Sequence, residues 1–314
     1  MFVQNINIEE FRGIKKCKEP LKFTSFTVLI GRNNSGKSAI LEALSLLPSP
    51  QRDESITMQS KIKFLRNLHR PNQPNQENNE CLLYLYEGTS KIDFKLDNQI
   101  ILTFKIEMNQ IEESYDNKNI AFNPQTLVLY IPNETSVINA MENRIEDLNY
   151  EITKKGIHIS VAKYLNKCVD DVYSEIILVK PILIRKVFSN QNTAYIKLKD
   201  LGSGAEKLVK FMSLIGALNP SLLLIDDFEV GFHPSLIKIF LEWLKEKDWQ
   251  TVISTQSIDL LDKLTEVKPS NTTILQLHKS QDDILSYKSL DLEQLEALLD
   301  ANTDPRLLVD ALRL

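Results

Sequence analysis

Short runs of uninterrupted apolar residues recur along the chain, separated by stretches in which apolar residues follow helical spacing. The segments "NINIEEF" and "FTVLI" are rich in β-branched and aromatic residues, which predicts two strands. Apolar residues then recur at helical spacing up to Pro48, which would end the helix; they are Ile40, Leu41, Leu44 and Leu47. A basic helix is expected over residues 56–70.

The next region favours strands first and helices later. We expect strands at "CLLYLYEG", "KIDFKLD" and "QIILTFKIEM", arranged as an antiparallel meander, and a further strand at "TLVLYIP". From about residue 133 to 180 helical spacing predominates, with one apolar stripe formed by Val137, Met141, Ile145, Leu148 and Ile152. This stripe is too short for a sustained coiled coil.

Strands and helices alternate in the last third of the chain. We expect a strand at "AYIKLKD", a helix opened by "LGSGAEKL" and ended by "NP" at 219, and a strand at "SLLLI". An apolar helix from 235, strands at "TVIS" and "TTILQLH", and a short helical end complete the pattern. Buried strands that alternate with helices are typical of a parallel sheet. The predicted fold is α/β, with a mostly parallel core sheet, an antiparallel β subdomain and a helical lobe.

Composition bounds the class of protein. With 314 residues, of which 43% are hydrophobic, the chain can bury a sizeable core. Its three cysteines are odd in number and far apart, which indicates neither a disulfide framework nor a metal site and favours a reducing compartment. The first residues lack the basic flank and apolar core of a signal peptide, and no apolar stretch reaches the length of a membrane span. We therefore expect a cytoplasmic protein with no membrane partner.

Charge is unevenly distributed along the chain. The net charge of −5 argues against a protein dominated by affinity for nucleic acid. Residues 180–210 nevertheless hold seven Lys or Arg against two acids, whereas residues 281–300 hold six acids and one Lys. The basic segment could approach an anion such as DNA; an ordinary solvated face is the alternative.

The segment "GRNNSGKS", residues 31–38, matches the phosphate-binding loop pattern G-x-x-x-x-G-K-[ST]. A predicted strand precedes it and a predicted helix follows, which is the context that the motif requires. Gly31 and Gly36 let backbone N–H groups point at phosphate oxygens, and the helix adds the positive end of its dipole. Lys37 would neutralise the β- and γ-phosphates, and the Ser38 hydroxyl would bind Mg²⁺.

A second anchor for Mg²⁺ is expected where "LLLID" ends, because such an Asp usually follows a neighbouring parallel strand. Asp226 takes that role in this interpretation. Asp227 points to another side and can face the water that attacks the γ-phosphate. The alternative is that both acids belong to a solvated turn after a strand.

The order of these motifs resembles that of the SMC/RecF/OLD-type ABC ATPases, and most closely the compact AAA ATPase-like proteins of that group, which have neither a TOPRIM domain nor a long coiled coil. The resemblance covers nearly the whole chain. It rests on "INIEEFRGIK" as the opening strand, "LIGRNNSGKSAILEAL" as Walker A, "LGSGAEKL" as the signature, "LLLIDDFEVGFHP" as Walker B with its D-loop, "VISTQS" as the switch and "LLDANTDPR" as the closing pattern.

This resemblance implies an ABC-type P-loop NTPase fold and a set of site residues. ATP and Mg²⁺ are the implied cofactors, with Ser38 and Asp226 on the metal. Lys37, Asp227 and Gln256 would be catalytic. Nucleotide contacts would come from Gly31, Arg32, Asn33, Asn34, Ser35, Gly36, Lys37, Ser38 and Ala39, and from Ser203 and Gly204 toward the nucleotide of a partner subunit.

The chain departs from the family pattern at three positions. Gly202 stands where the signature usually has Ser, so the contact in trans would depend more on backbone N–H groups. Asp227 replaces the usual Glu after the Walker B Asp, and Gln256 replaces the usual His of the switch. Gln can still form hydrogen bonds but cannot carry charge. These changes imply slow ATP hydrolysis.

The resemblance also implies domain organisation and function. We expect a single ABC-type ATPase domain over 1–314, with lobe I at about 1–132 plus 220–314 and a helical, signature-bearing lobe at about 133–219. The leading hypothesis is an ATP-driven dimerisation switch, a homodimer when ATP is bound, acting on DNA or on a protein partner such as a nuclease in DNA maintenance, repair or defence. An ATP-dependent scaffold with very slow hydrolysis and a transporter ATP-binding subunit are the alternatives.

Overall fold

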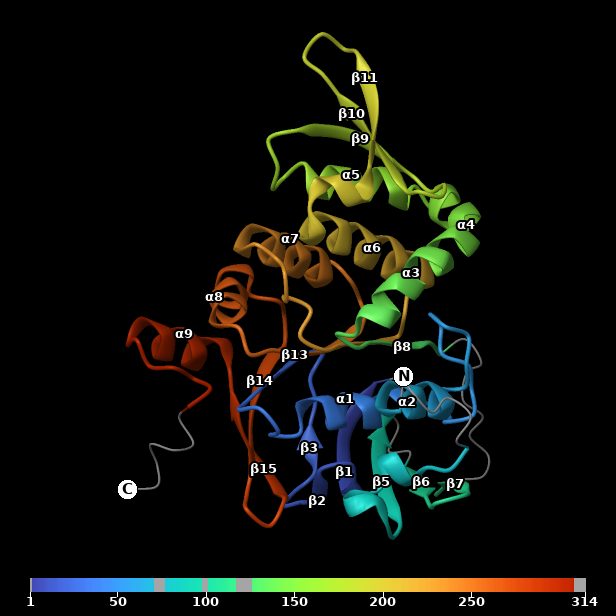
Figure 1. Ribbon diagram of the computed structural model, residues 1–314. Coiled ribbons are helices and arrows are strands. Elements are labelled where there is room, and N and C mark those ends of the chain that lie inside the picture. The colour runs from blue at the N-terminus through green and yellow to red at the C-terminus, as the bar shows by residue number, and fades with distance from the viewer. Residues whose placement is uncertain (1, 71–76, 98–100, 117–125, 308–314) are drawn as a thin grey trace.

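The described residues form a sheet of twelve strands, and the parallel part of this sheet is the core of the protein. The computed structural model describes residues 2–70, 77–97, 101–116 and 126–307 (Figure 1). The parallel strands are β4 (Phe26–Ile30), β8 (Val128–Ile131), β12 (Leu222–Ile225), β13 (Gln250–Ser254) and β14 (Thr272–Lys279). They lie in the order β14-β4-β13-β12-β8. Every residue of β4, β8, β12 and β13 is buried, which explains their near-continuous apolar sequences.

The remaining strands of this sheet, most of them in antiparallel pairs, continue it beyond β14. They are β1 (Val3–Phe11), β2 (Ile14–Cys17), β3 (Leu21–Lys22), β5 (Ser90–Leu96), β6 (Ile101–Ile106), β7 (Ile111–Tyr115) and β15 (Ile284–Leu290). The order runs β7-β6-β5-β1-β2-β15-β14, with β3 paired to β1. Strand β15 is antiparallel to β14 and parallel to β2, so it joins the two halves.

Helices pack on the sheet and form a lobe above it in Figure 1. The helices are α1 (Lys37–Ser45), α2 (Lys61–His69), α3 (Thr135–Asp147), α4 (Asn149–Lys154), α5 (Ile157–Leu165), α6 (Ser203–Leu218), α7 (Pro234–Lys245), α8 (Ile258–Val267) and α9 (Leu292–Asp300). A small antiparallel sheet of β9 (Val172–Ile177), β10 (Leu183–Val187) and β11 (Thr193–Lys197) packs on α5 and projects from this lobe (Figure 1). The predicted α/β class is confirmed; the division into two lobes stays a prediction.

Several sequence-based expectations are wrong in detail. The segment "CLLYLYEG" forms two single turns of 3₁₀ helix, Glu80–Leu82 and Tyr84–Tyr86, because Leu85 and Tyr86 adopt left-handed backbone conformations that a strand excludes. The helical region does not reach residue 180, since β9 begins at Val172. Six strands were not predicted, namely β2, β3, β7, β9, β10 and β15, and the meander consists of β5, β6 and β7. Part of the "QIILTFKIEM" prediction lies outside the described residues.

None of the helices within the described ranges is long and apolar enough to cross a bilayer. The three cysteines, which all lie in those ranges, are free.

Candidate active site

The phosphate loop occupies the turn between β4 and α1. Three of its residues have positive φ angles: 147° at Gly31, 63° at Asn34 and 99° at Gly36. A Cβ atom at Gly31 would lie 2.7 Å from the carbonyl oxygen of Leu277, so only glycine lets the loop approach β14 this closely. The first turn of α1 begins directly after Gly36 and turns its unpaired N–H groups toward the loop.

Lys37 is held inside this loop. Its side chain is only 6% exposed, and its amine donates to the carbonyl oxygens of Gly31 at 3.0 Å and of Arg32 at 3.1 Å. Burial lowers the pKa of Lys37, and the nearby carboxylates of Asp227 and Asp226 oppose that shift. The loop therefore carries a positive charge at the position where the motif expects phosphate.

The two adjacent acids at the end of β12, Asp226 and Asp227, lie in different environments. Asp226 is 9% exposed and accepts a hydrogen bond from the hydroxyl of Ser254, with the hydroxyl of Ser38 close by. Burial raises the pKa of Asp226, an effect that these hydroxyl donors oppose. Asp227 has a φ of 41°, and its N–H donates to the Ser254 hydroxyl at 3.1 Å. This left-handed turn separates the directions of the two side chains.

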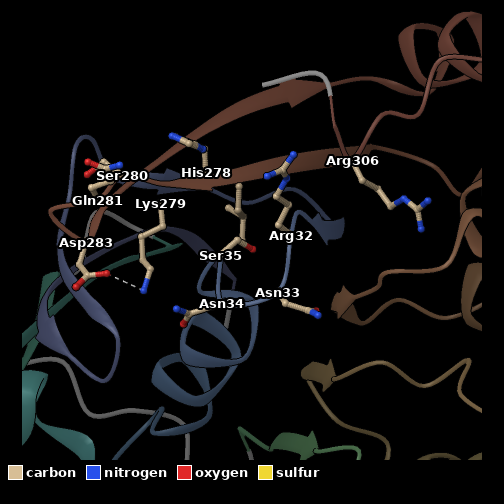
Figure 2. Close-up of a pocket in the computed structure, with 11 residues that line it drawn as sticks. Arg32, Asn33, Asn34, Ser35, His278, Lys279, Ser280, Gln281, Asp283 and Arg306 are labelled. Carbon is tan, nitrogen blue, oxygen red and sulfur yellow. Dashed lines mark ion pairs between the residues drawn. The ribbon is translucent and has the colours of Figure 1, made fainter. Parts of the chain in front are cut away.

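A cavity of about 300 Å³ brings most of the predicted residues together. It is lined by Arg12, Gly13, Asn33, Asn34, Ser35, Gly36, Lys37, Ser38, Ala39, Asp227 and Gln256. Asp226 lies behind this surface, against Ser38. Arg32 lines a second cavity of about 380 Å³ on another side of the same loop (Figure 2).

Ser203 and Gly204 do not line the cavity of their own chain. Ser203 is exposed at the beginning of α6. Gly204 packs on the loop before α7, where an added Cβ would lie 2.8 Å from the carbonyl oxygen of Gly231. These two signature residues thus lie outside the cavity formed by the phosphate loop of the same subunit.

A hydroxyl and a carboxylate lie together where the sequence predicts Mg²⁺. The Ser38 hydroxyl is close enough to Asp226 to lower the pKa of that carboxyl, and Mg²⁺ prefers such oxygen ligands, usually one or two from the protein with the rest from phosphates and water. Within the described part of the chain no group of three or more His, Cys, Asp or Glu is placed to hold a metal. The residues present fit a cation bound jointly by protein and nucleotide.

Arg12 was not predicted as a site residue, although it lies in the opening strand motif. Its guanidinium donates to Glu42 at 3.0 Å and to the carbonyl oxygen of Cys81 at 2.9 Å, and lies 2.9 Å from Nδ1 of His69. His69 in turn contacts Glu42 at 3.0 Å. Three separate segments therefore fix Arg12 at the edge of the cavity. Only the "FRG" motif itself could have drawn attention to it.

Glu229, the third acid of "DDFE", was also missed. It is 8% exposed, and one of its carboxylate oxygens accepts from the hydroxyl of Thr255 and from the N–H of Gln256, the latter at 3.4 Å. Its other oxygen has no hydrogen-bond partner among the described residues. Burial raises the pKa of Glu229. This residue links the loop after β12 to the switch segment.

Lys207 brings the signature helix into the same neighbourhood. Its amine donates to the carbonyl oxygen of Val230 at 3.1 Å. Burial lowers the pKa of Lys207, and the charges of Glu229 and Asp227 oppose that shift. The first turns of α6 and the loop after β12 are therefore coupled through a buried charge.

A phosphate loop between β4 and α1, with an acidic residue at the end of nearby β12, defines a P-loop nucleotide hydrolase. Comparison with known families agrees. Residues 1–177 match the family described as "AAA ATPase domain", and residues 96–262 match the one described as "AAA domain, putative AbiEii toxin, Type IV TA system". The chain belongs to the family of AAA ATPase domains and is an ATPase.

Individual relatives are distant. An "ATP/GTP phosphatase" of Helicobacter pylori is 23% identical over an alignment of 333 positions, gaps included, which covers 84% of this chain and 88% of the relative. The crystal structure of an Smc head bound to the C-terminal winged-helix domain of ScpA aligns with a TM-score of 0.62 at 13% identity, covering 95% of this chain and all of the other. The SMC head of Thermotoga maritima gives a TM-score of 0.54 at 13% identity, with coverage of 93% and 100%. These structures share the fold of the SMC-like ABC ATPases, as the motifs predicted.

Proposed function

We propose that this ATPase is an ATP-driven dimerisation switch with slow hydrolysis. One observation carries the proposal. Ser203 begins α6 exposed and outside its own cavity, which is arranged around Lys37, Asp227 and Gln256. An exposed helix N-terminus suits the γ-phosphate of a nucleotide bound by a second copy of the chain.

The residues of the cavity have different roles in binding and hydrolysing ATP. The N–H groups of residues 31–38 and the Lys37 amine bind the phosphates, with Ser203 and Gly204 acting in trans. Ser38 and Asp226 would hold Mg²⁺, which would neutralise charge on the phosphate oxygens. Asp227 orients the attacking water, and the Gln256 side chain supplies a hydrogen bond to that water or to the γ-phosphate.

Two features favour a switch over a pump. Asp227 is one methylene shorter than the usual Glu, and Gln256 cannot take a proton, so a closed dimer would be long-lived. The same features favour the second candidate, a scaffold that uses ATP mainly to remain dimeric. Steady ATP turnover separates the two.

A protein partner is part of this proposal. One structural relative was solved bound to a domain of ScpA, and another SMC head, derived from Pyrococcus furiosus, aligns with a TM-score of 0.57. We propose that this chain, acting in the cytoplasm, also binds a partner, and that it transmits dimerisation to a protein such as a nuclease, or to DNA, in maintenance, repair or defence.

Light scattering tests the proposal directly. The wild type should change from monomer to dimer when ATP or a slowly hydrolysed analogue is added. Ser203→Arg should abolish this change, because the larger side chain blocks the interface, while ATP still binds to each monomer. Ser189→Arg, at an exposed position in the β10–β11 connection, is the matched control and should dimerise normally. A mass that responds to neither ATP nor Ser203→Arg would reject the switch.

A further inference from the structure

The segment after α9 is anchored to the core sheet. Gln276 on β14 is 1% exposed, and its side-chain amide donates to the carbonyl oxygen of Pro305 at 2.5 Å. Asp304 and Arg306 flank this point and form a two-pronged ion pair, with Nε to Oδ1 at 2.8 Å and Nη2 to Oδ2 at 2.6 Å. Such a fork holds the guanidinium in one plane and one direction.

The remaining nitrogen of this guanidinium reaches the switch segment. Nη1 of Arg306 donates to the main-chain carbonyl oxygen of Gln256. On its other side the N–H of Gln256 faces the carboxylate of Glu229 at 3.4 Å. The peptide groups around Gln256 are thus held at both ends, by the loop after β12 and by the segment after α9. Gln256 lines the nucleotide cavity, so this backbone fixes the point from which its side chain extends.

Figure 2 supports a positioning role over direct contact with an anion. Arg306 lines the second cavity at the end away from Gln281 and Asp283, and its side chain extends away from them. Its charge is matched by Asp304, and its third nitrogen is occupied by a carbonyl. A guanidinium engaged in this way has little left to offer a phosphate group.

We infer that Arg306 is a positioning residue for ATP hydrolysis, because it holds the backbone of the switch residue Gln256 and thereby orients its side chain. The segment 303–307 is then a control element of the active site. This inference rests on the role proposed for Gln256. Without Arg306 the Gln256 peptide can rotate, so its side chain samples orientations that do not meet the water or the γ-phosphate. Misplacement on the scale of 1 Å can cost on the order of a hundredfold in rate.

The effect should fall on kcat. We expect Arg306→Ala to lower single-turnover hydrolysis by roughly tenfold, while the Kd for ATP changes less than about twofold, because no phosphate contact is lost. Arg306→Lys keeps the charge beside Asp304 but cannot make the fork and the carbonyl contact together, so it should show a smaller loss. The matched control is Arg144→Ala on α3. Arg144 also donates to a main-chain carbonyl, that of Ser55 at 2.9 Å, and pairs with Asp147, yet lines neither cavity.

A double-variant comparison identifies the route of the effect. If Arg306 acts through Gln256, adding Arg306→Ala to Gln256→Ala should cost nothing further in kcat. The inference would be overturned if Arg306→Ala lowered kcat by the same factor in the wild type and in Gln256→Ala. It would also be overturned if both Arg306 variants hydrolysed ATP at the wild-type rate. Light scattering on the same samples keeps the two proposals apart. A wild type that hydrolyses ATP but never dimerises rejects the switch alone, whereas normal dimerisation with a kcat insensitive to Arg306 rejects the positioning role alone.

Discussion

The hydroxyl of Thr255 donates a hydrogen bond to the buried carboxylate of Glu229, and this contact joins the loop after β12 to the loop after β13. Each loop carries one residue that lines the nucleotide cavity, Asp227 in the first and Gln256 in the second. The two proposed catalytic side chains are therefore coupled through a pair of residues that does not itself line the cavity.

Glu229 should make stability depend on pH. Burial raises its pKa in the folded protein, so the folded state favours the neutral form, and the associated stability is present below the unfolded pKa and lost as pH rises through the folded pKa. Glu229→Gln removes this titration. The unfolding free energy of the variant minus that of the wild type should therefore increase as the pH rises from the unfolded pKa of a glutamate, 4.5, through the higher folded pKa. Urea unfolding at four pH values measures the difference.

An exposed carboxylate provides the control for this pH dependence of the unfolding free energy. Glu293 is exposed on α9, and Glu293→Gln should follow the wild-type pH dependence. If Glu229→Gln and Glu293→Gln run parallel to the wild type across the whole range, Glu229 does not bury a titrating charge.

Local motifs made the centre of the site predictable. The spacing of Gly31, Gly36, Lys37 and Ser38 is contained in eight residues between a strand and a helix, so it required no knowledge of distant contacts. Asp226 and Asp227 could be predicted as site residues because a run of apolar residues ends at them. The parallel core followed from uninterrupted apolar strands.

Long-range contacts explain what was missed. Arg306 meets Gln256 across 50 positions of sequence, and Arg12 meets Cys81 across 69. No spacing rule connects residues so far apart. Strand β15 was missed because its polar and apolar residues alternate weakly, and it is specified by pairing with β14 and β2. At "CLLYLYEG" a strand was predicted that does not form, because the prediction relied on composition and composition does not reveal the left-handed backbone at Leu85.

Lys37→Ala should weaken ATP binding while the fold survives. The amine is the buried positive charge of the loop, and charge-assisted hydrogen bonds contribute about 1.5–3 kcal/mol each, so we expect Kd for ATP to rise by at least roughly tenfold. Titration with a fluorescent ATP analogue measures it. Lys63→Ala, exposed on α2, should bind as the wild type does. Identical titration curves for Lys37→Ala and the wild type would remove Lys37 from the site.

The expectation of DNA binding now rests on fewer residues than the sequence indicated. Of the seven basic residues between 180 and 210, five are paired or buried: Lys180, Arg185, Lys186, Lys207 and Lys210. Lys197 and Lys199 are exposed and make no ion pair with any described residue. Binding to DNA should be weak, independent of sequence and steeply reduced by salt, since phosphate contacts release counterions.

Charge reversal at these two lysines tests the prediction. Lys197→Glu with Lys199→Glu should abolish the retention of a fluorescent duplex at low salt with ATP present. Lys18→Glu with Lys63→Glu changes the net charge equally at exposed positions elsewhere and should retain binding. Equal binding by the two double variants, or no binding by the wild type, would exclude this surface.

Asp227→Asn and Asp226→Asn should each lose different activities. Asn tolerates the left-handed backbone of residue 227, where φ is 41°, so Asp227→Asn keeps the turn and removes only the charge that we propose orients water. It should bind ATP and dimerise, and hydrolyse about a hundredfold more slowly or worse. Asp226→Asn alters the carboxylate that contacts Ser38, so it should lose the dependence of ATP binding on Mg²⁺ as well as turnover. Single-turnover hydrolysis, ATP titration with and without Mg²⁺, and light scattering on both variants separate the two roles. Wild-type hydrolysis by Asp227→Asn would leave Asp227 as a turn residue with no part in the chemistry.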